Sequence, residues 1–160
     1  MDIRLPFRRL LAHDRWANGQ ALASLEAMPE PPRKALGLMG HLMGAEATWL
    51  ERMTAGRDPG DWEVWENADA AWLRTAWRED LGARWAAFLA NPDLCNPARA
   101  FTYVNHLGET HKVRVEDAVT QLMLHSAYHR GQVASAVRAA GGTPAVTDFM
   151  QAVRGGALDG

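Results

Sequence analysis

Apolar side chains recur at steps of three and four residues along most of the chain, which is the spacing of one face of an α-helix. In the first third of the sequence this spacing predicts one helix over residues 5–28 and a second over residues 33–54. The segment "PEPP" at 29–32 separates them, because proline cannot continue a helix. Gly56 and Pro59 then end the second stripe. We therefore expect two amphipathic helices joined by a short turn.

The same period predicts two more helices in the second half of the chain. One runs from about Asn67 to Phe88 and is ended by the prolines of "NPDLCNP", and the last covers residues 115–140 before a "GG" stop. Between them, residues 101–115 hold β-favouring side chains around "NHLGET", which predicts a short hairpin turning near Gly108. The predicted fold is all-α, a four-helix bundle with a short β-hairpin before the last helix.

Composition and charge narrow the class of protein. The 160 residues fit a single domain over residues 1–160, and 17 basic and 19 acidic residues give a net charge of -2 with no block of one sign. This pattern argues against nucleic acid or an anionic membrane as a partner. No apolar run is long enough to span a membrane, and Cys95 is the only cysteine. We therefore expect a cytoplasmic protein without an internal disulfide.

Two histidines lie one turn apart in the last predicted helix, within "HSAYHRGQ". At about 100° per residue, His125 and His129 fall on the apolar stripe of that helix, with their Cβ atoms about 5–6 Å apart. At this spacing both rings can reach one metal ion. A buried histidine is also a common hydrogen-bonded core residue, so the pair alone favours neither interpretation strongly.

A metal site in a bundle core needs ligands from facing helices, and two other predicted helices carry histidines. His41 falls on the margin of the apolar stripe of the second helix, whereas His13 lies to one side of the stripe of the first. His41 is therefore the better candidate. Asp14 lies in the apolar stripe of the first helix, where a carboxylate needs a partner. Three roles are open to it: a fourth metal ligand, a hydrogen-bond acceptor for a ligand histidine, or the ion-pair partner of an arginine such as Arg130.

Several segments together resemble the DinB/YfiT-like superfamily of small metal-binding four-helix bundles. They are "HDRWANGQAL", "HLMGAEATWLERM", "FTYVNHLGETHKV", "HSAYHRGQ" and "AAGGTP", and the likeness spans about residues 5–150. The resemblance implies a site for one divalent ion per chain formed by His41, His125 and His129, and a homodimer. Members of this family with known activities include thiol-dependent S-transferases and a thiol-dependent maleylpyruvate isomerase. Ferritin-like di-iron chemistry is disfavoured, because the sequence contains no Glu-x-x-His.

Three imidazoles leave a metal ion with an open coordination position, as in catalytic zinc sites. Zinc or nickel is expected, and a low-molecular-weight thiol or a water molecule can bind in that position and lose a proton. We therefore expect a small-molecule substrate and rank a thiol S-transferase first. A metal-dependent hydrolase and a non-catalytic, metal-stabilised stress or binding protein remain as alternatives.

Other side chains are weaker candidates for a role in the chemistry. Tyr128 and Arg130 can hold an anionic group of a substrate, and Gln132 can hydrogen-bond a ligand histidine or a bound water. His106 and His111, on the predicted hairpin, can act as an acid or base at the mouth of a pocket. Two tryptophans in the loop after the second helix, Trp62 and Trp65, can line such a pocket. Each of these residues also has an ordinary packing or surface role open to it.

Overall fold

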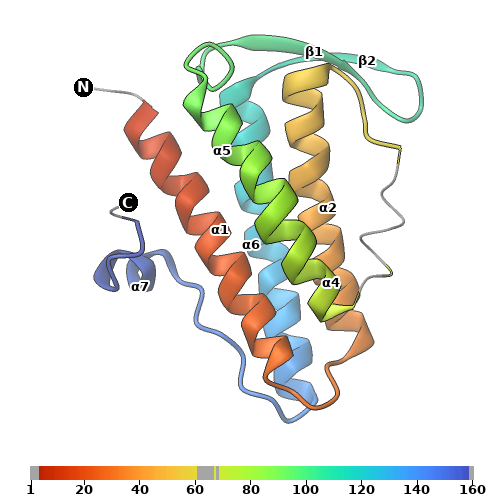
Figure 1. Cartoon of the computed structure of the whole chain (residues 1–160), viewed down its shortest axis with the longest axis vertical. Helices are drawn as coiled ribbons and strands as arrows, with labels where there is room; N and C mark the ends of the chain where they lie inside the picture. Colours follow the sequence, from red (N-terminus) through yellow and green to blue (C-terminus); the bar gives the residue numbers. More distant parts are fainter. Residues whose placement is uncertain (1–3, 61–66, 68, 159–160) are drawn as a thin grey trace.

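The computed structural model describes residues 4–60, 67 and 69–158 and shows a mostly helical chain with a short two-stranded antiparallel sheet (Figure 1). The helical elements are α1 (Arg4–Glu26), α2 (Arg33–Ala55), α4 (Ala70–Thr75), η1 (Ala76–Leu81), α5 (Gly82–Ala90), α6 (Val115–Ala139) and α7 (Phe149–Arg154). The strands are β1 (Ala100–Val104) and β2 (Thr110–Arg114). Trp62 and Trp65 lie outside the described residues.

The bounds of α1, α2 and α6 agree with the sequence prediction to within two residues. The third helix begins at Ala70 rather than near Asn67, because the side chain of Asp69 caps it by accepting a hydrogen bond of 2.8 Å from the backbone N–H of Trp72. Figure 1 shows α4 and α5 as one continuous run, with the π-helical segment η1 between them. Apolar periodicity does not predict this π-segment, whose Trp77 and Leu81 are both buried.

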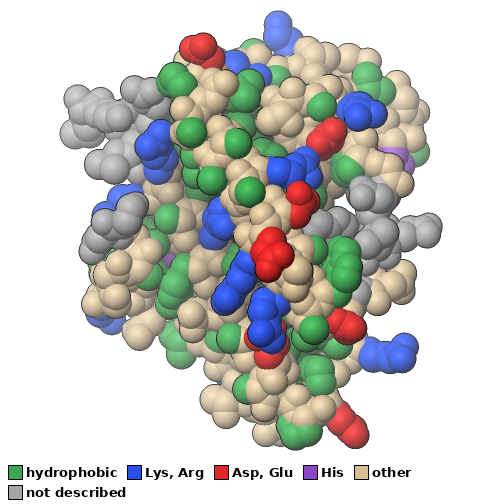
Figure 2. Space-filling view, viewed as in Figure 1, with side chains coloured by type: hydrophobic (Ala, Val, Ile, Leu, Met, Phe, Trp, Pro, Cys, Tyr) green, Lys and Arg blue, Asp and Glu red, His purple; other side chains and the backbone are tan. Residues whose placement is uncertain are grey.

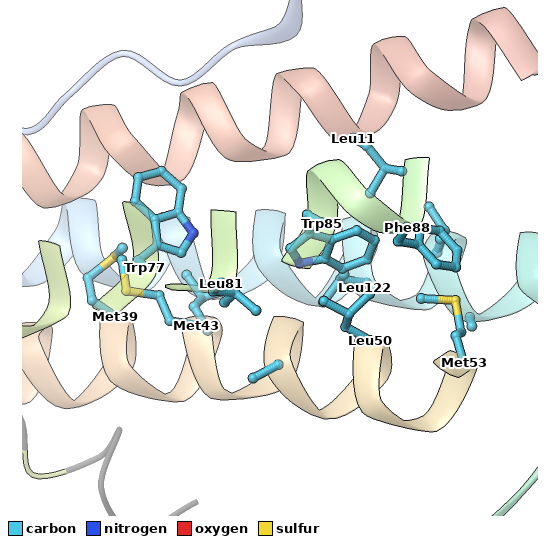
Figure 3. Close-up of a cluster of buried hydrophobic side chains, with 14 of the residues drawn as sticks. Leu11, Met39, Met43, Leu50, Met53, Trp77, Leu81, Trp85, Phe88 and Leu122 are labelled. Atoms are coloured by element: carbon cyan, nitrogen blue, oxygen red, sulfur yellow. The ribbon is translucent and has the colours of Figure 1, made fainter. Parts of the chain in front are cut away.

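The long helices run side by side along the molecule (Figure 1). α2 and α6 are antiparallel and pack against each other, and α1 covers both of them. Figure 3 shows the core between these helices, where Trp77, Trp85 and Phe88 point toward Met39, Met43, Leu50 and Leu122. The apolar faces predicted from the sequence therefore meet in one core, and α2 and α6 lie together along their length.

The hairpin closes one end of the molecule. β1 and β2 pair with Tyr103 opposite His111, and the turn uses Gly108 with a φ of 78°. Gly56, directly after α2, is bonded through its carbonyl oxygen to the backbone N–H of Val104 at 3.0 Å. The predicted hairpin is thus confirmed and is anchored to the C-terminal end of α2.

The last described segment folds back over α1. Asp148 caps α7, and the preceding carbonyl oxygen of Thr147 lies 3.1 Å from Nε2 of His13. The ring of Phe149 meets the His13 ring edge to face at 5.1 Å. His13 is therefore an interface residue between α1 and the C-terminal segment, as its place beside the helix-one stripe predicts.

Basic and acidic side chains are interspersed over the face seen in Figure 2, which agrees with the near-neutral composition. Arg74 pairs with Glu26, and Arg84 pairs with Glu51, so charges of opposite sign join the third helical run to α1 and α2. None of the described helices is long and apolar enough to cross a membrane.

Candidate metal centre

Three histidine rings converge between α2 and α6. Nε2 of His125 lies 3.1 Å from Nε2 of His41 and 3.1 Å from Nε2 of His129. Ring nitrogens of all three lie within 4.8 Å of one another, and the rings meet at steep angles of 62°, 79° and 80°. The three side chains are partly exposed, so the cluster faces solvent on one side.

The donor set fits a divalent ion. Nitrogen ligands about 2.0–2.1 Å from a tetrahedral zinc ion lie about 3.3 Å apart, close to the two observed Nε2 distances of 3.1 Å. One turn of α6 supplies two of the rings, and the antiparallel packing of α2 supplies the third. The three-histidine cluster is therefore compatible with the binding of one divalent ion.

Gln132 orients one of these rings. Nδ1 of His129 lies 2.8 Å from Oε1 of Gln132, one turn further along α6. An amide oxygen only accepts hydrogen bonds, so Nδ1 of His129 carries the proton and Nε2 keeps its lone pair toward the cluster. A hydrogen bond of this kind is typical of metal-binding histidines.

The environment also keeps the middle ring neutral. Burial, together with the neighbouring His129 and His41, lowers the pKa of His125 to about 4. A neutral imidazole is the form that binds a metal ion. At neutral pH, His125 therefore does not need to lose a proton before it can act as a ligand.

Asp14 is not beside the histidines but forms an ion pair in the core. Nη1 of Arg130 donates to Oδ1 of Asp14 at 2.5 Å and to Oδ1 of Asn18 at 2.8 Å. Arg130 is 5 % exposed and Asp14 is 2 % exposed. Of the alternatives for Asp14, the structure shows the ion pair with Arg130, and Arg130 faces α1 rather than solvent.

This ion pair continues into a buried polar network that the sequence analysis missed. Nδ2 of Asn18 donates to Oε1 of Glu46 at 2.6 Å, and Nε1 of Trp77 donates to both oxygens of Glu46 at 3.2–3.3 Å. Burial, with the nearby charge of Asp14, raises the pKa of Glu46 to about 8, so this carboxyl is mostly protonated at neutral pH. The signal was present, since Glu46 lies on the buried stripe of α2, four residues from both Leu42 and Leu50.

The remaining candidates lie in two places. Tyr128 is beside the cluster, with its ring centroid 5.1 Å from that of His129, and its side chain is largely exposed. His106 and His111 are on the hairpin, where they contact Asp58 and Glu109. The hairpin is anchored at the C-terminal end of α2, fourteen residues and therefore about 21 Å beyond His41. The structure therefore brings Tyr128 and Gln132 to the histidines but not His106 or His111.

Comparison with known proteins adds one finding. The family model described as the DinB family matches residues 6–155, which is most of the chain and includes all three clustered histidines. No curated protein and no solved structure matches the chain.

Proposed function

Because the chain belongs to the DinB family, we propose that it is a divalent-metal-binding protein whose ion is held by His41, His125 and His129 within a DinB-type four-helix bundle. The convergence of three Nε2 atoms from two helices is the observation that carries this proposal. Zinc or nickel suits three imidazoles best, since both accept histidine nitrogen readily.

We propose further that the centre is catalytic and of the thiol-dependent S-transferase type. When bound, the ion lowers the pKa of a thiol or water in its open position and so supplies a nucleophile at neutral pH. The protein's own contribution is to hold the three rings, to fix the proton of His129 on Nδ1 through Gln132, and to leave the cluster open to solvent. Sulfur matches a borderline-soft ion, which places thiol transfer ahead of the hydrolase alternative.

A non-catalytic, metal-stabilised role is the alternative from another class. It requires a fourth protein ligand that closes the site. Asp14 was the sequence candidate for that ligand, and its contacts with Arg130 and Asn18 in the core support an open centre instead.

Metal analysis tests the centre directly. We expect about one zinc or nickel ion per chain in protein purified without chelator, and loss of that ion in His125→Ala. His111→Ala is the matched control, because this ring is a hairpin histidine outside the cluster. Full metal content in His125→Ala would contradict the proposed set of three ligands.

Cobalt substitution tests the thiol. A small thiol added to the cobalt form should produce a sulfur-to-metal charge-transfer band that is absent in His129→Ala. If no common cellular thiol produces this band, the thiol-transferase proposal is wrong, and hydrolysis or a non-catalytic role is left.

Assembly and location complete the proposal. We propose a homodimer, supported by large apolar side chains that are exposed on α6, Leu124 and Tyr128. Sedimentation over a range of concentrations tests this, and a monomer mass throughout would contradict it. The single cysteine supports a cytoplasmic location.

A further inference from the structure

A groove lined by residues of α6 and of the start of α2 lies next to the histidine cluster, to which Gln132 connects it. Its walls include Lys34 on α2 and Gln132, Ser135, Ala136 and Ala139 on α6. It is an open groove with a volume of about 530 Å³, within the range of small-molecule sites. The groove lies along the same pair of antiparallel helices that carries the three histidines.

Helix geometry places the groove and the cluster along the same line of contact between α2 and α6, called the seam below. Lys34 precedes His41 by seven residues, so the two side chains share a face of α2 and lie about 10.5 Å apart along its axis. On α6, Gln132 and Ala136 follow His129 by three and seven residues and share its face in the same way. A molecule lying along the seam can therefore reach from the cluster to Lys34.

Gln132 belongs to both places. Its Oε1 accepts the hydrogen bond from Nδ1 of His129, and its side chain also lines the groove. The amide N–H groups of Gln132 remain as donors for a ligand, because the oxygen is the atom used by the histidine. Binding in the groove is thus linked to the orientation of one of the cluster rings.

The chemistry of the walls specifies a ligand class. Lys34 is the one charged side chain among the described residues that line the groove, and it forms no ion pair within the described part of the chain. α2 begins where α6 ends, so the opposed helix dipoles offset each other and the ammonium group sets the local charge. The alanines between Lys34 and Gln132 leave room for an apolar chain.

We propose that this groove binds the far end of the small molecule that reacts at the histidine cluster, and that Lys34 pairs with a carboxylate there. The ligand class is a small, extended molecule with a reactive end, an apolar middle and an anionic end about two helical turns away. This inference rests on the proposed metal centre. It also differs from the sequence expectation for Arg130, whose guanidinium is already paired with Asp14.

Thiols of graded length test the inference in the cobalt-substituted protein. The probes are 3-mercaptopropionate and 8-mercaptooctanoate, each compared with the mercaptoalcohol of equal length. The long acid should bind about threefold to tenfold tighter than the long alcohol, as expected for one partly exposed ion pair. The short pair should show no such preference, because 3-mercaptopropionate does not span the seam.

Lys34→Ala should abolish the preference for the long acid, and Arg33→Ala should retain it. Arg33 is the matched control, since it is the adjacent exposed cation and does not line the groove. Equal affinity for acid and alcohol at both lengths would overturn the inference, as would loss of the preference in both variants.

A second measurement does not depend on thiol chemistry. Octanoate and octanol are titrated into the zinc-loaded protein while backbone amide NMR signals are followed. Octanoate should shift the signals of Lys34, Gln132 and Ser135 at lower concentration than octanol, and this difference should vanish in Lys34→Ala. If thiols give no cobalt band, only the proposed function is contradicted. If octanoate leaves these signals unchanged, the proposal that the groove binds a ligand is contradicted.

Discussion

Glu46 is a carboxyl whose surroundings favour its neutral form. Its two oxygens accept hydrogen bonds from Asn18 and Trp77, and Arg130, the cation of this hydrogen-bonded network, is bound to Asp14. Burial and the charge of Asp14 raise its pKa from 4.5 to about 8. The folded protein therefore keeps a proton on this side chain over a pH range in which the unfolded chain has lost it.

This proton makes stability depend on pH. Between pH 4.5 and about 8 the folded state binds one more proton at Glu46 than the unfolded state, so this group lowers the free energy of unfolding as pH rises. The contribution of Glu46 to the free energy of unfolding falls by at most about 1.4 kcal/mol per pH unit. Glu46→Gln keeps the shape of the protonated group but cannot titrate. We expect the variant to gain stability relative to the wild type between pH 5 and 8, as measured by urea denaturation.

Glu30→Gln is the control for this comparison, because Glu30 is exposed in the turn between α1 and α2. Its stability should follow the wild-type pH profile. If Glu46→Gln also follows that profile, the buried proton does not exist.

Gln132 gives a second prediction at this scale. Gln132→Ala removes the acceptor for Nδ1 of His129, so the ring loses its fixed orientation. We expect metal affinity to fall by about tenfold to a hundredfold, measured by competition with a chromophoric chelator. Gln132→Glu keeps an acceptor and should retain most of the affinity. Gln121→Ala, an exposed position on the same helix, should leave the affinity unchanged.

At the level of helices, the sequence predicted the elements well and the details of their contact less well. Periodicity gave α1, α2, α6 and the hairpin, but it did not identify all the polar side chains of the core. Asp14 was placed on the buried stripe of the first helix from the sequence, whereas Asn18 and Glu46 were not recognised as buried. Apolar patterns do not reveal such residues, since their partners lie on other helices.

The same limit explains the candidate site. His125 and His129 are recognisable from sequence because one helix fixes their spacing. The association of His41 with them depends on how α2 packs on α6. Its place at the margin of the apolar stripe made it a candidate, and the family resemblance implied the complete set of three. The role of Gln132 follows local helix geometry again and was expected, whereas the groove beside Lys34 depends on two helix surfaces and was not.

The Asp14–Arg130 pair joins α1 to α6 and gives a prediction for helix packing. Asp14→Ala leaves the guanidinium of Arg130 buried without its carboxylate, which should cost about 3–5 kcal/mol. The control is Glu116→Ala, which removes the exposed ion pair with Arg114 at 3.1 Å and should cost at most about 1 kcal/mol. Chemical denaturation measures both. Similar costs in the two variants would show that burial of the first pair has no energetic consequence.

On the scale of the whole molecule, the histidine cluster joins two long helices, so an ion bound there should stabilise the entire fold. An ion present at a hundred times its Kd adds about 2.7 kcal/mol. For a chain of this size that corresponds to a rise in Tm of about 5–10 °C. We therefore expect chelator to lower Tm by this amount and added zinc or nickel to restore it, as followed by circular dichroism.

His125→Ala should melt at the same temperature with and without metal, because it lacks one of the three rings. A metal-dependent Tm in this variant would place the stabilising ion elsewhere. The exposed ring of His111 again provides the control, since His111→Ala should retain the full metal-dependent rise.

The distance along the chain between Asp14 and Arg130, 116 residues, also has a consequence for synthesis on the ribosome. α1 and α2 are translated first and carry Asp14, Asn18 and Glu46, whereas Arg130, which pairs with Asp14, follows only when α6 is made. Until then, the carboxylate of Asp14 lacks its buried cation and resists leaving water. We therefore expect the buried polar network and the histidine cluster to be completed only after α6 has emerged from the ribosome.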